Sequence, residues 1–75
     1  MDTRELTERA AQRIPLGPRE MEVLEKLLDG ETERAIGRAL DISTHTVHSH
    51  ARSLYLKFDV HSRLELFRTL VLNSG

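Results

Sequence analysis

The sequence predicts an all-α fold: a compact four-helix bundle that contains a helix-turn-helix and follows a polar N-terminal segment. Apolar residues recur at helical spacing, while no sustained period-2 alternation appears. The chain has 75 residues, which allow one small domain and no second core. Capping and turn residues divide it into short helical segments.

The N-terminal segment, residues 1–14, is mostly polar or charged, and the predicted domain covers residues 15–75. In the segment, Leu6, Ala10 and Ile14 recur at i, i+4 and i+8. This spacing fits a short helix that docks on the domain, but a frayed linker fits the polar composition equally well. Both alternatives stay open from the sequence.

The first two helices of the domain have clear start and stop signals. Pro18 suits the first position of a helix, and Asp29-Gly30 ends that helix. Thr32 caps a second helix that runs through Leu40. We therefore expect these two helices to span about ten residues each.

A tight turn at Asp41-Ile42 joins the second helix to a third one, which Ser43 caps and which spans residues 44–58. Ser62 caps a fourth helix that ends at about Leu72. The third helix has a predicted buried stripe at helical spacing: Val47, Ala51, Leu54 and Phe58.

Two helices joined by such a short turn are typical of a helix-turn-helix, whose second helix lies in the major groove of DNA. Gly37 is expected at the crossing, where a missing side chain lets two helices approach. The solvent face of helix 44–58 carries side chains that are able to meet phosphates and base edges. These side chains are His45, His48, Ser49 and Arg52.

The net charge of −1 is unevenly distributed along the chain. Residues 1–33 carry nine acids and five bases, a net charge of −4. Residues 34–63 carry five bases and two acids, a net charge of +3, together with all four histidines. A basic block beside an acidic start indicates one face that meets an anion.

The sequence contains no pattern typical of an enzyme or of a cofactor site. It has no cysteine and no glycine-rich phosphate loop, and Ser43 and Ser62 fit helix caps rather than nucleophiles. Positions 48 and 50 point about 200° apart on a helix, so only His45 and His48 share a face. Two ligands do not make a zinc site, and we expect no metal.

A cytoplasmic location without membrane contact is expected. No run of apolar residues exceeds three, and the first five residues lack the apolar segment of a signal peptide. The absence of cysteine also fits a reducing compartment.

Residues 16–24, Leu-Gly-Pro-Arg-Glu-Met-Glu-Val-Leu, resemble the opening of the LuxR/GerE-type DNA-binding domain. The resemblance covers residues 15–72 without a gap and includes the tail Ser62 to Leu66. Its other matching residues are Gly30, Ile36, Leu40, Ile42, Ser43, Thr46, Val47, His50, Lys57 and Val60.

The resemblance implies a transcription regulator that binds double-stranded operator DNA as a dimer, with helix 44–58 in the major groove. RNA polymerase is a further candidate partner. The residues implied to contact base edges are His48, Ser49 and Arg52. The residues implied to contact phosphates are Arg34, Thr44, His45, Thr46 and Lys57.

Several positions depart from the pattern of the family. Gly17 replaces a usual threonine cap, Ala35 a common glutamate and Gly37 a common alanine. His48 stands where lysine is frequent, so a permanent charge is replaced by a side chain that ordinarily titrates near pH ~6.5. His50 flanks the buried stripe and is expected to be packed and hydrogen-bonded rather than to contact DNA.

The fourth helix has two apolar edges. Leu66, Phe67 and Leu70 form a stripe sufficient to cover the core, while Leu64 and Val71 form a second edge. We expect a symmetric homodimer through this helix, rather than a helix that only covers the core. The expected interface residues are Leu64, Phe67 and Val71.

An alternative function is a helix-turn-helix protein-interaction module that has lost DNA binding. The acidic first helix and the lysine-poor third helix of the domain suggest it. Both a stand-alone small regulator and the DNA-binding domain of a longer regulator fit the sequence, which leaves no room for a sensor module in 75 residues.

Overall fold

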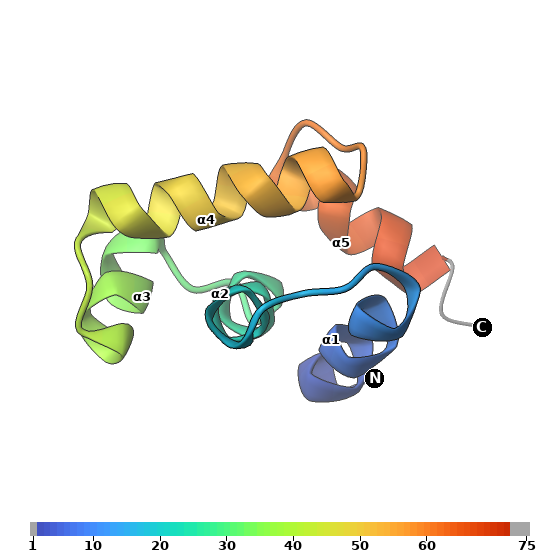
Figure 1. Ribbon diagram of the computed structural model, residues 1–75, viewed down its shortest axis with the longest axis horizontal. Coiled ribbons are helices and arrows are strands. Elements are labelled where there is room, and N and C mark those ends of the chain that lie inside the picture. Colours follow the sequence, from blue (N-terminus) through green and yellow to red (C-terminus); the bar gives the residue numbers. More distant parts are fainter. Residues whose placement is uncertain (1, 73–75) are drawn as a thin grey trace.

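The computed structural model describes residues 2–72, which form five helices and no strand (Figure 1). The all-α prediction is confirmed, and the four expected helices of the domain are present. Met1 and residues 73–75 of the predicted segments lie outside the described residues. Within residues 2–72, every helix is too short or too polar to cross a membrane. The helices are α1 Thr3–Arg13, α2 Pro18–Leu28, α3 Glu33–Leu40, α4 Thr44–Lys57 and α5 Arg63–Leu72.

The N-terminal segment forms a helix, α1, that belongs to the packed structure. The Asp2 carboxylate accepts a hydrogen bond of 3.0 Å from the Arg4 backbone N–H and thereby caps the helix. Leu6 and Ala10 are buried, and α1 packs against α2 and α5. The docked-helix alternative is therefore the one that the structure adopts.

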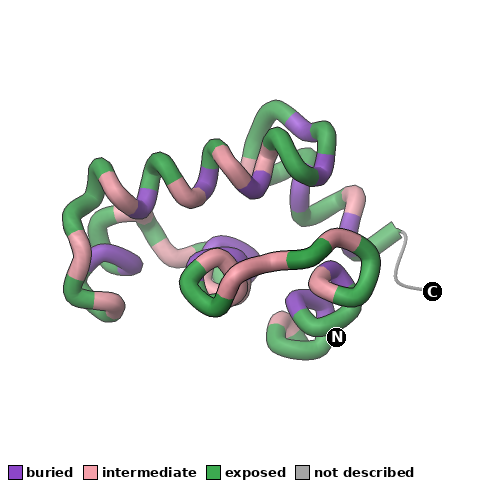
Figure 2. Tube along the Cα trace, viewed as in Figure 1, coloured by how far each residue is buried: buried purple, intermediate pink, exposed green. Residues whose placement is uncertain are grey.

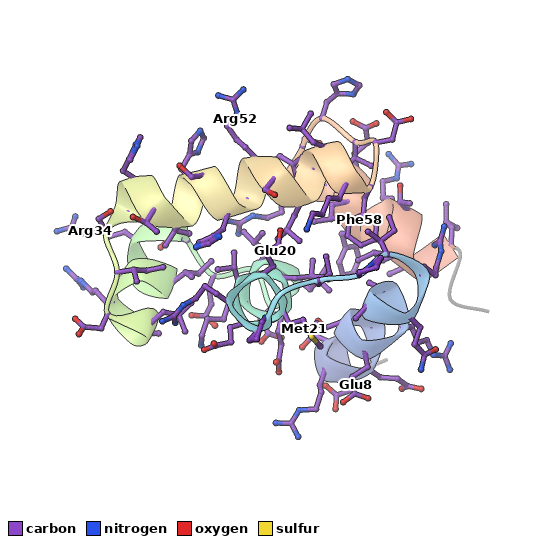
Figure 3. The ribbon with its side chains drawn as sticks, viewed as in Figure 1. Glu8, Glu20, Met21, Arg34, Arg52 and Phe58 are labelled. Atoms are coloured by element: carbon purple, nitrogen blue, oxygen red, sulfur yellow. The ribbon has the colours of Figure 1, made fainter. Side chains whose placement is uncertain are left out.

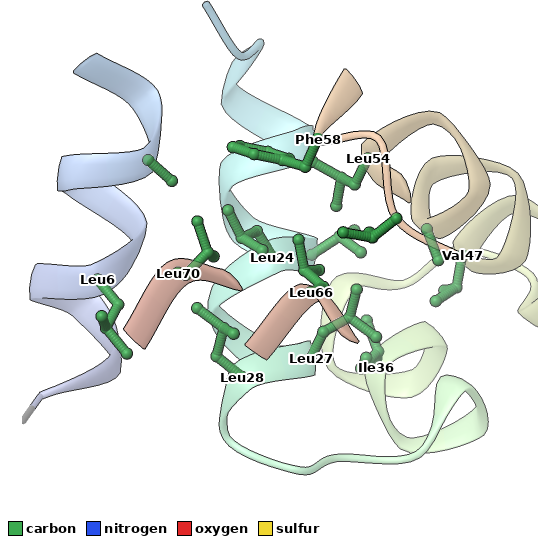
Figure 4. Packing of buried hydrophobic residues seen from close by; sticks show 14 residues of the cluster. Leu6, Leu24, Leu27, Leu28, Ile36, Val47, Leu54, Phe58, Leu66 and Leu70 are labelled. Atoms are coloured by element: carbon green, nitrogen blue, oxygen red, sulfur yellow. The ribbon is translucent and has the colours of Figure 1, made fainter. Parts of the chain in front are cut away.

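Helix α2 is the centre of the core, with the other four helices packed around it. It is seen end-on in Figure 1, and Figure 4 shows Leu24 and Leu27 of α2 among apolar side chains from the surrounding helices. Val23, Leu24 and Leu27 are essentially inaccessible to solvent. Met21, at helical spacing from Leu24 and Leu28, is only half-buried.

The turn between α3 and α4 has the capping residues that the sequence predicts. Thr32 caps α3, Asp41 adopts a left-handed conformation with φ of 57°, and Ser43 caps α4. A Cβ atom on Gly37 would lie 2.8 Å from the Ile42 carbonyl oxygen. Glycine at this position therefore lets the turn pack directly against α3.

The buried face of α3 is narrow, and the predicted end of α4 needs a small correction. Ile36 and Gly37 of α3 are buried, while Ala35 and Ala39 are exposed. Helix α4 ends at Lys57, one residue earlier than predicted, and Phe58 is its buried C-cap.

The break after α4 also contributes to the core. Asp59 has a φ of 55°, and the Val60 backbone N–H donates to the Tyr55 carbonyl oxygen at 2.9 Å. This arrangement closes the helix end and turns the Val60 side chain into the core, where it is buried. The sequence predicted only an interruption here.

One acidic side chain joins the start of α2 to the C-terminal half of α4. The Glu20 carboxylate accepts hydrogen bonds from the Gly17 backbone N–H at 2.9 Å, the Lys57 ammonium at 2.8 Å and the Ser53 hydroxyl at 3.1 Å. The Lys57 hydrogen bond, followed by the Gly17 and Ser53 donors, lowers the pKa of Glu20 below its ordinary value. Figure 3 shows Glu20 between the two helices.

We expect Leu6→Ala to lower the free energy of unfolding by about 2–3 kcal/mol, because it leaves a cavity between α1 and its neighbours. Leu6 is only 2% exposed. Urea unfolding measures the change, and Leu56→Ala is the control, since Leu56 is 79% exposed. Equal stability of the two variants would show that α1 is not part of the cooperative core.

We expect Glu20→Gln to lower the free energy of unfolding by about 1–2 kcal/mol at pH 7. Because the folded-state pKa of Glu20 is lowered, its contribution is complete above the unfolded-state pKa of about 4.3. It disappears as the pH falls through the lower folded-state pKa. The difference from the wild type should therefore shrink below about pH 4 in urea unfolding at several pH values.

The control for this pH series is Glu22→Gln. The Glu22 carboxylate is half-exposed, 3.6 Å from Arg19, and its loss should change stability by less than about 0.5 kcal/mol. An identical pH dependence in both variants would contradict the role given to Glu20.

Candidate nucleic-acid interface

Helix α4 has one side packed on the core and one side exposed. Val47, Ala51 and Leu54 are fully buried against α2 and α3. Figure 2 shows buried positions on the inner side of α4 and exposed ones on its outer side. We define the recognition face as the exposed residues His45, His48, Ser49 and Arg52. The structure thus brings four predicted site residues to one surface.

Arg52 is the permanently charged residue of the recognition face. It is exposed, and in Figure 3 its side chain extends away from α2 and the rest of the fold. A guanidinium group has five N–H donors in a planar fork and suits both guanine edges and phosphates.

The N-terminal end of α4 lies beside two arginines of α3. A hollow of about 380 Å³ is lined by Arg34, Arg38 and Thr44, together with the residues of the turn. The first turn of α4 has no acidic residue, so the positive end of the helix dipole is not offset by a carboxylate there. Arg38 was not predicted as a site residue, although its i+4 spacing from Arg34 places both on one side of α3.

Thr46 and Ser49 are partly engaged within the helix. The Ser43 hydroxyl accepts from the Thr46 backbone N–H at 3.0 Å, and the Ser43 and Thr46 hydroxyl oxygens are 2.8 Å apart. The Ser49 hydroxyl donates to the His45 carbonyl oxygen at 3.2 Å. The hydroxyl oxygens of Thr46 and Ser49 keep acceptor capacity.

His48 contacts an acidic residue that the sequence did not single out. Its Nδ1 lies 3.1 Å from a carboxylate oxygen of Glu33, the first residue of α3. The two residues are 15 positions apart, a separation that no helical periodicity connects. His50, expected to be packed, is half-buried.

Lys57 lies at the opposite end of α4 from the turn and is the ion-pair partner of Glu20. Its side chain is 36% exposed, so it keeps access to solvent while one N–H donates to the carboxylate. Its expected role as a phosphate contact stays a prediction.

The sequence predicts that the histidines of α4 do not form a metal site. Among residues 2–72, no group of three His, Cys, Asp or Glu side chains is placed to hold a metal ion. Protein donors therefore offer no complete first coordination sphere in that part of the chain.

A second exposed surface lies on α5. Leu66 and Leu70 are buried, but Leu64 is 64% exposed and Phe67 and Val71 are each 39% exposed. Phe67 was expected in the core stripe with Leu66 and Leu70, but it is partly exposed and lies at the border between the core and the exposed edge of α5. Leu64 and Phe67 also line an apolar hollow of about 380 Å³ together with Leu27, Leu28, Gly30 and Arg63.

Comparison with known proteins identifies the family of this chain. Residues 15–70 match the family described as bacterial regulatory proteins, luxR family. No solved structure matches the chain significantly.

Two curated proteins of Escherichia coli (strain K12) are similar to the chain. The uncharacterized response regulatory protein YgeK is 36% identical over 69 residues, which are 92% of this chain and 47% of YgeK. The putative HTH-type transcriptional regulator YhjB is 42% identical over 59 residues, which are 79% of this chain and 30% of YhjB.

The chain thus spans about half or less of the length of these relatives. The family match, by contrast, covers the helix-turn-helix, the recognition face and most of α5. The resemblance noted in the sequence is confirmed, and this chain belongs to the luxR family of bacterial regulatory proteins.

Proposed function

We propose that this chain is the sequence-specific DNA-binding unit of a transcription regulator, with α4 in the major groove. The observation that carries the proposal is the two-sided character of α4. Its inner side is fully buried, so the helix is held rigidly, while its outer side presents donors and acceptors to solvent. A rigid helix with a polar outer face meets the requirements for reading base edges.

The proposed contacts divide into two groups. His48, Ser49 and Arg52 lie along the middle of the recognition face and are proposed to contact base edges. Residues at the two ends are proposed to contact phosphates and set the register of the helix on DNA. These residues are Arg34, Thr44, His45 and Thr46 near the turn, and Lys57 at the far end.

We also propose that two copies bind DNA as a symmetric dimer through α5, with Leu64, Phe67 and Val71 in the interface. Exposed apolar side chains on a terminal helix gain stability when a second copy covers them. Two-fold symmetry then presents two recognition helices to successive major grooves. The regulator would act in the cytoplasm, and RNA polymerase is its proposed further partner.

The second candidate function is a protein-interaction module. Two observations favour it: the Glu20 carboxylate pairs with Lys57, and the Glu33 carboxylate lies 3.1 Å from His48, so each brings a negative charge close to α4. Titration with random and genomic DNA at low salt separates the two functions. Absence of binding to every DNA supports the interaction module.

We expect Arg52→Ala to weaken specific DNA binding about tenfold, because one direct base or phosphate contact is lost. The site is first selected from a random DNA pool, and affinity is then measured by fluorescence anisotropy at several salt concentrations. The wild-type affinity should fall linearly on logarithmic axes, since each neutralised phosphate releases counterions.

Arg13→Ala is the matched control, because it removes the same charge from the exposed end of α1. Its affinity should stay within about twofold of the wild type. A wild-type affinity that is insensitive both to salt and to Arg52 would contradict DNA recognition by α4.

We expect Leu64→Glu to raise the dimer dissociation constant at least about tenfold, since it places a charge in an apolar interface. Sedimentation equilibrium measures the change. Leu64 is 64% exposed, so the monomer fold should persist. Leu56→Glu on α4 is the control, and equal dimerisation of both variants would show that α5 is not the interface.

A further inference from the structure

A contact between His48 and Glu33 joins the recognition face to α3. Its Nδ1 is 3.1 Å from the Glu33 carboxylate, within hydrogen-bond distance. The side chain of His48 is 54% exposed and that of Glu33 is 32% exposed. One nitrogen of the ring thus contacts Glu33 at the protein surface, while the ring as a whole remains accessible to solvent.

A neutral imidazole ring carries its proton on one nitrogen and a lone pair on the other. A carboxylate accepts hydrogen bonds and does not donate them when it is ionised. A neutral His48 that is bonded to Glu33 must therefore carry its proton on Nδ1, and its Nε2 becomes an acceptor. Carboxylates fix histidine tautomers in the same way behind metal ions.

The polarity of Nε2 decides which base edges it can contact. In the major groove, adenine and cytosine present amino groups that donate, whereas guanine and the thymine O4 accept. A phosphate oxygen also only accepts. An acceptor at Nε2 therefore fits the amino group of adenine or cytosine and fits neither guanine nor a phosphate.

We propose that Glu33 is a positioning residue that fixes neutral His48 as the Nδ1–H tautomer, so that Nε2 accepts a hydrogen bond from adenine or cytosine. This inference rests on the proposed placement of α4 in the major groove. It makes α3 a determinant of base preference, although Glu33 itself does not contact the base.

The charged and titratable groups around His48 come from two elements. Helix α3 brings Glu33, with Arg34 next to it in the chain. On α4 itself, His45 lies one turn before His48 and Arg52 one turn after it. Helix α2 brings Glu20 to α4, but this carboxylate bonds to Ser53 and Lys57 in the C-terminal half.

When His48 is protonated, both of its ring nitrogens donate. The Nε2 atom then fits guanine or a phosphate instead of adenine or cytosine.

A structural role of Glu33 predicts different behaviour. As the acidic residue in the first turn of α3, Glu33 also interacts favourably with the helix dipole. That role affects the stability of α3, but it has no influence on the tautomer of His48 or on the base that it prefers. Measuring the tautomer of His48 and its base preference therefore distinguishes a positioning role of Glu33 from a purely structural one.

The first measurement is made on the free protein and does not depend on DNA. Nitrogen-15 NMR of the His48 ring at pH 8 should show the proton on Nδ1 in the wild type. In Glu33→Ala the proton should redistribute towards Nε2, while Glu8→Gln should match the wild type. Glu8 is exposed on α1, far from α4 in Figure 3. A wild-type ring protonated on Nε2, or on both nitrogens, at pH 8 overturns the proposal.

The second measurement is the base preference at pH 8. His48→Ala first identifies the base pair whose preference depends on residue 48. At that position the wild type should prefer adenine or cytosine about fivefold over guanine or thymine, the effect of one hydrogen bond. Glu33→Ala should lose this preference and still bind DNA, while His48→Lys, which can only donate, should reverse it. Adding Glu33→Ala to His48→Ala should change the preference no further.

The outcomes separate this inference from the proposed function. If the wild type binds no DNA, the proposed function fails, while the NMR measurement still decides the role of Glu33. If DNA binds but Glu33→Ala keeps the wild-type preference, the proposed function stands and the inference is overturned. Glu8→Gln controls for the loss of one negative charge, which alone should raise affinity for all sequences alike.

Discussion

The burial of α2 by the other four helices is the interaction on which the rest of the structure depends. Val23, Leu24 and Leu27 are removed from solvent only when neighbouring helices enclose α2. In a chain of 75 residues, one such core must offset the loss of chain entropy. The inner side of α4 is part of this enclosure. The helix proposed to enter DNA is therefore held by the same contacts that stabilise the fold.

Two acidic residues, one on α2 and one on α3, also hold polar side chains of α4 in position. Glu20 bonds to Lys57 near one end of the helix, and Glu33 bonds to His48 nearer the other. The first pair offsets the charge of Lys57, the second brings a carboxylate next to His48, and each restricts a side chain to fewer conformations. The proposed recognition by α4 would thus rely more on the direction of individual hydrogen bonds than on general attraction to an anion.

The local features of the fold could be predicted from the sequence because they depend on neighbouring residues. The caps Thr32 and Ser43, the left-handed Asp41 and the buried stripe of α4 all follow from short-range rules and are present. The burial of Val60 could not be predicted, because it follows from the left-handed turn at Asp59 after α4.

The residues of the candidate interface on α4 could be predicted to a similar extent, but their contacts could not. Helical spacing was sufficient to place His45, His48, Ser49 and Arg52 on one exposed face. The partners of His48 and Lys57 were not predictable, since they lie 15 and 37 residues away and meet them only through helix packing. In the same way, composition left the segment before α2 undecided, and the contacts of Leu6 and Ala10 with the core determine its structure.

The two proposed interfaces, on α4 and on α5, would support each other energetically. Residues 34–63, which contain the recognition face, have a net charge of only +3. Counterion release would therefore contribute limited affinity if one copy bound DNA alone. Dimerisation makes the second contact intramolecular, so the affinities of two weak sites combine without additional charge. On α5, the Leu70 side is buried in the core, and the edge with Leu64 and Val71 is left exposed. Core packing thus leaves one apolar edge of α5 exposed, as the proposed dimer requires, and a recognition helix of low charge would suit a protein that binds DNA in pairs.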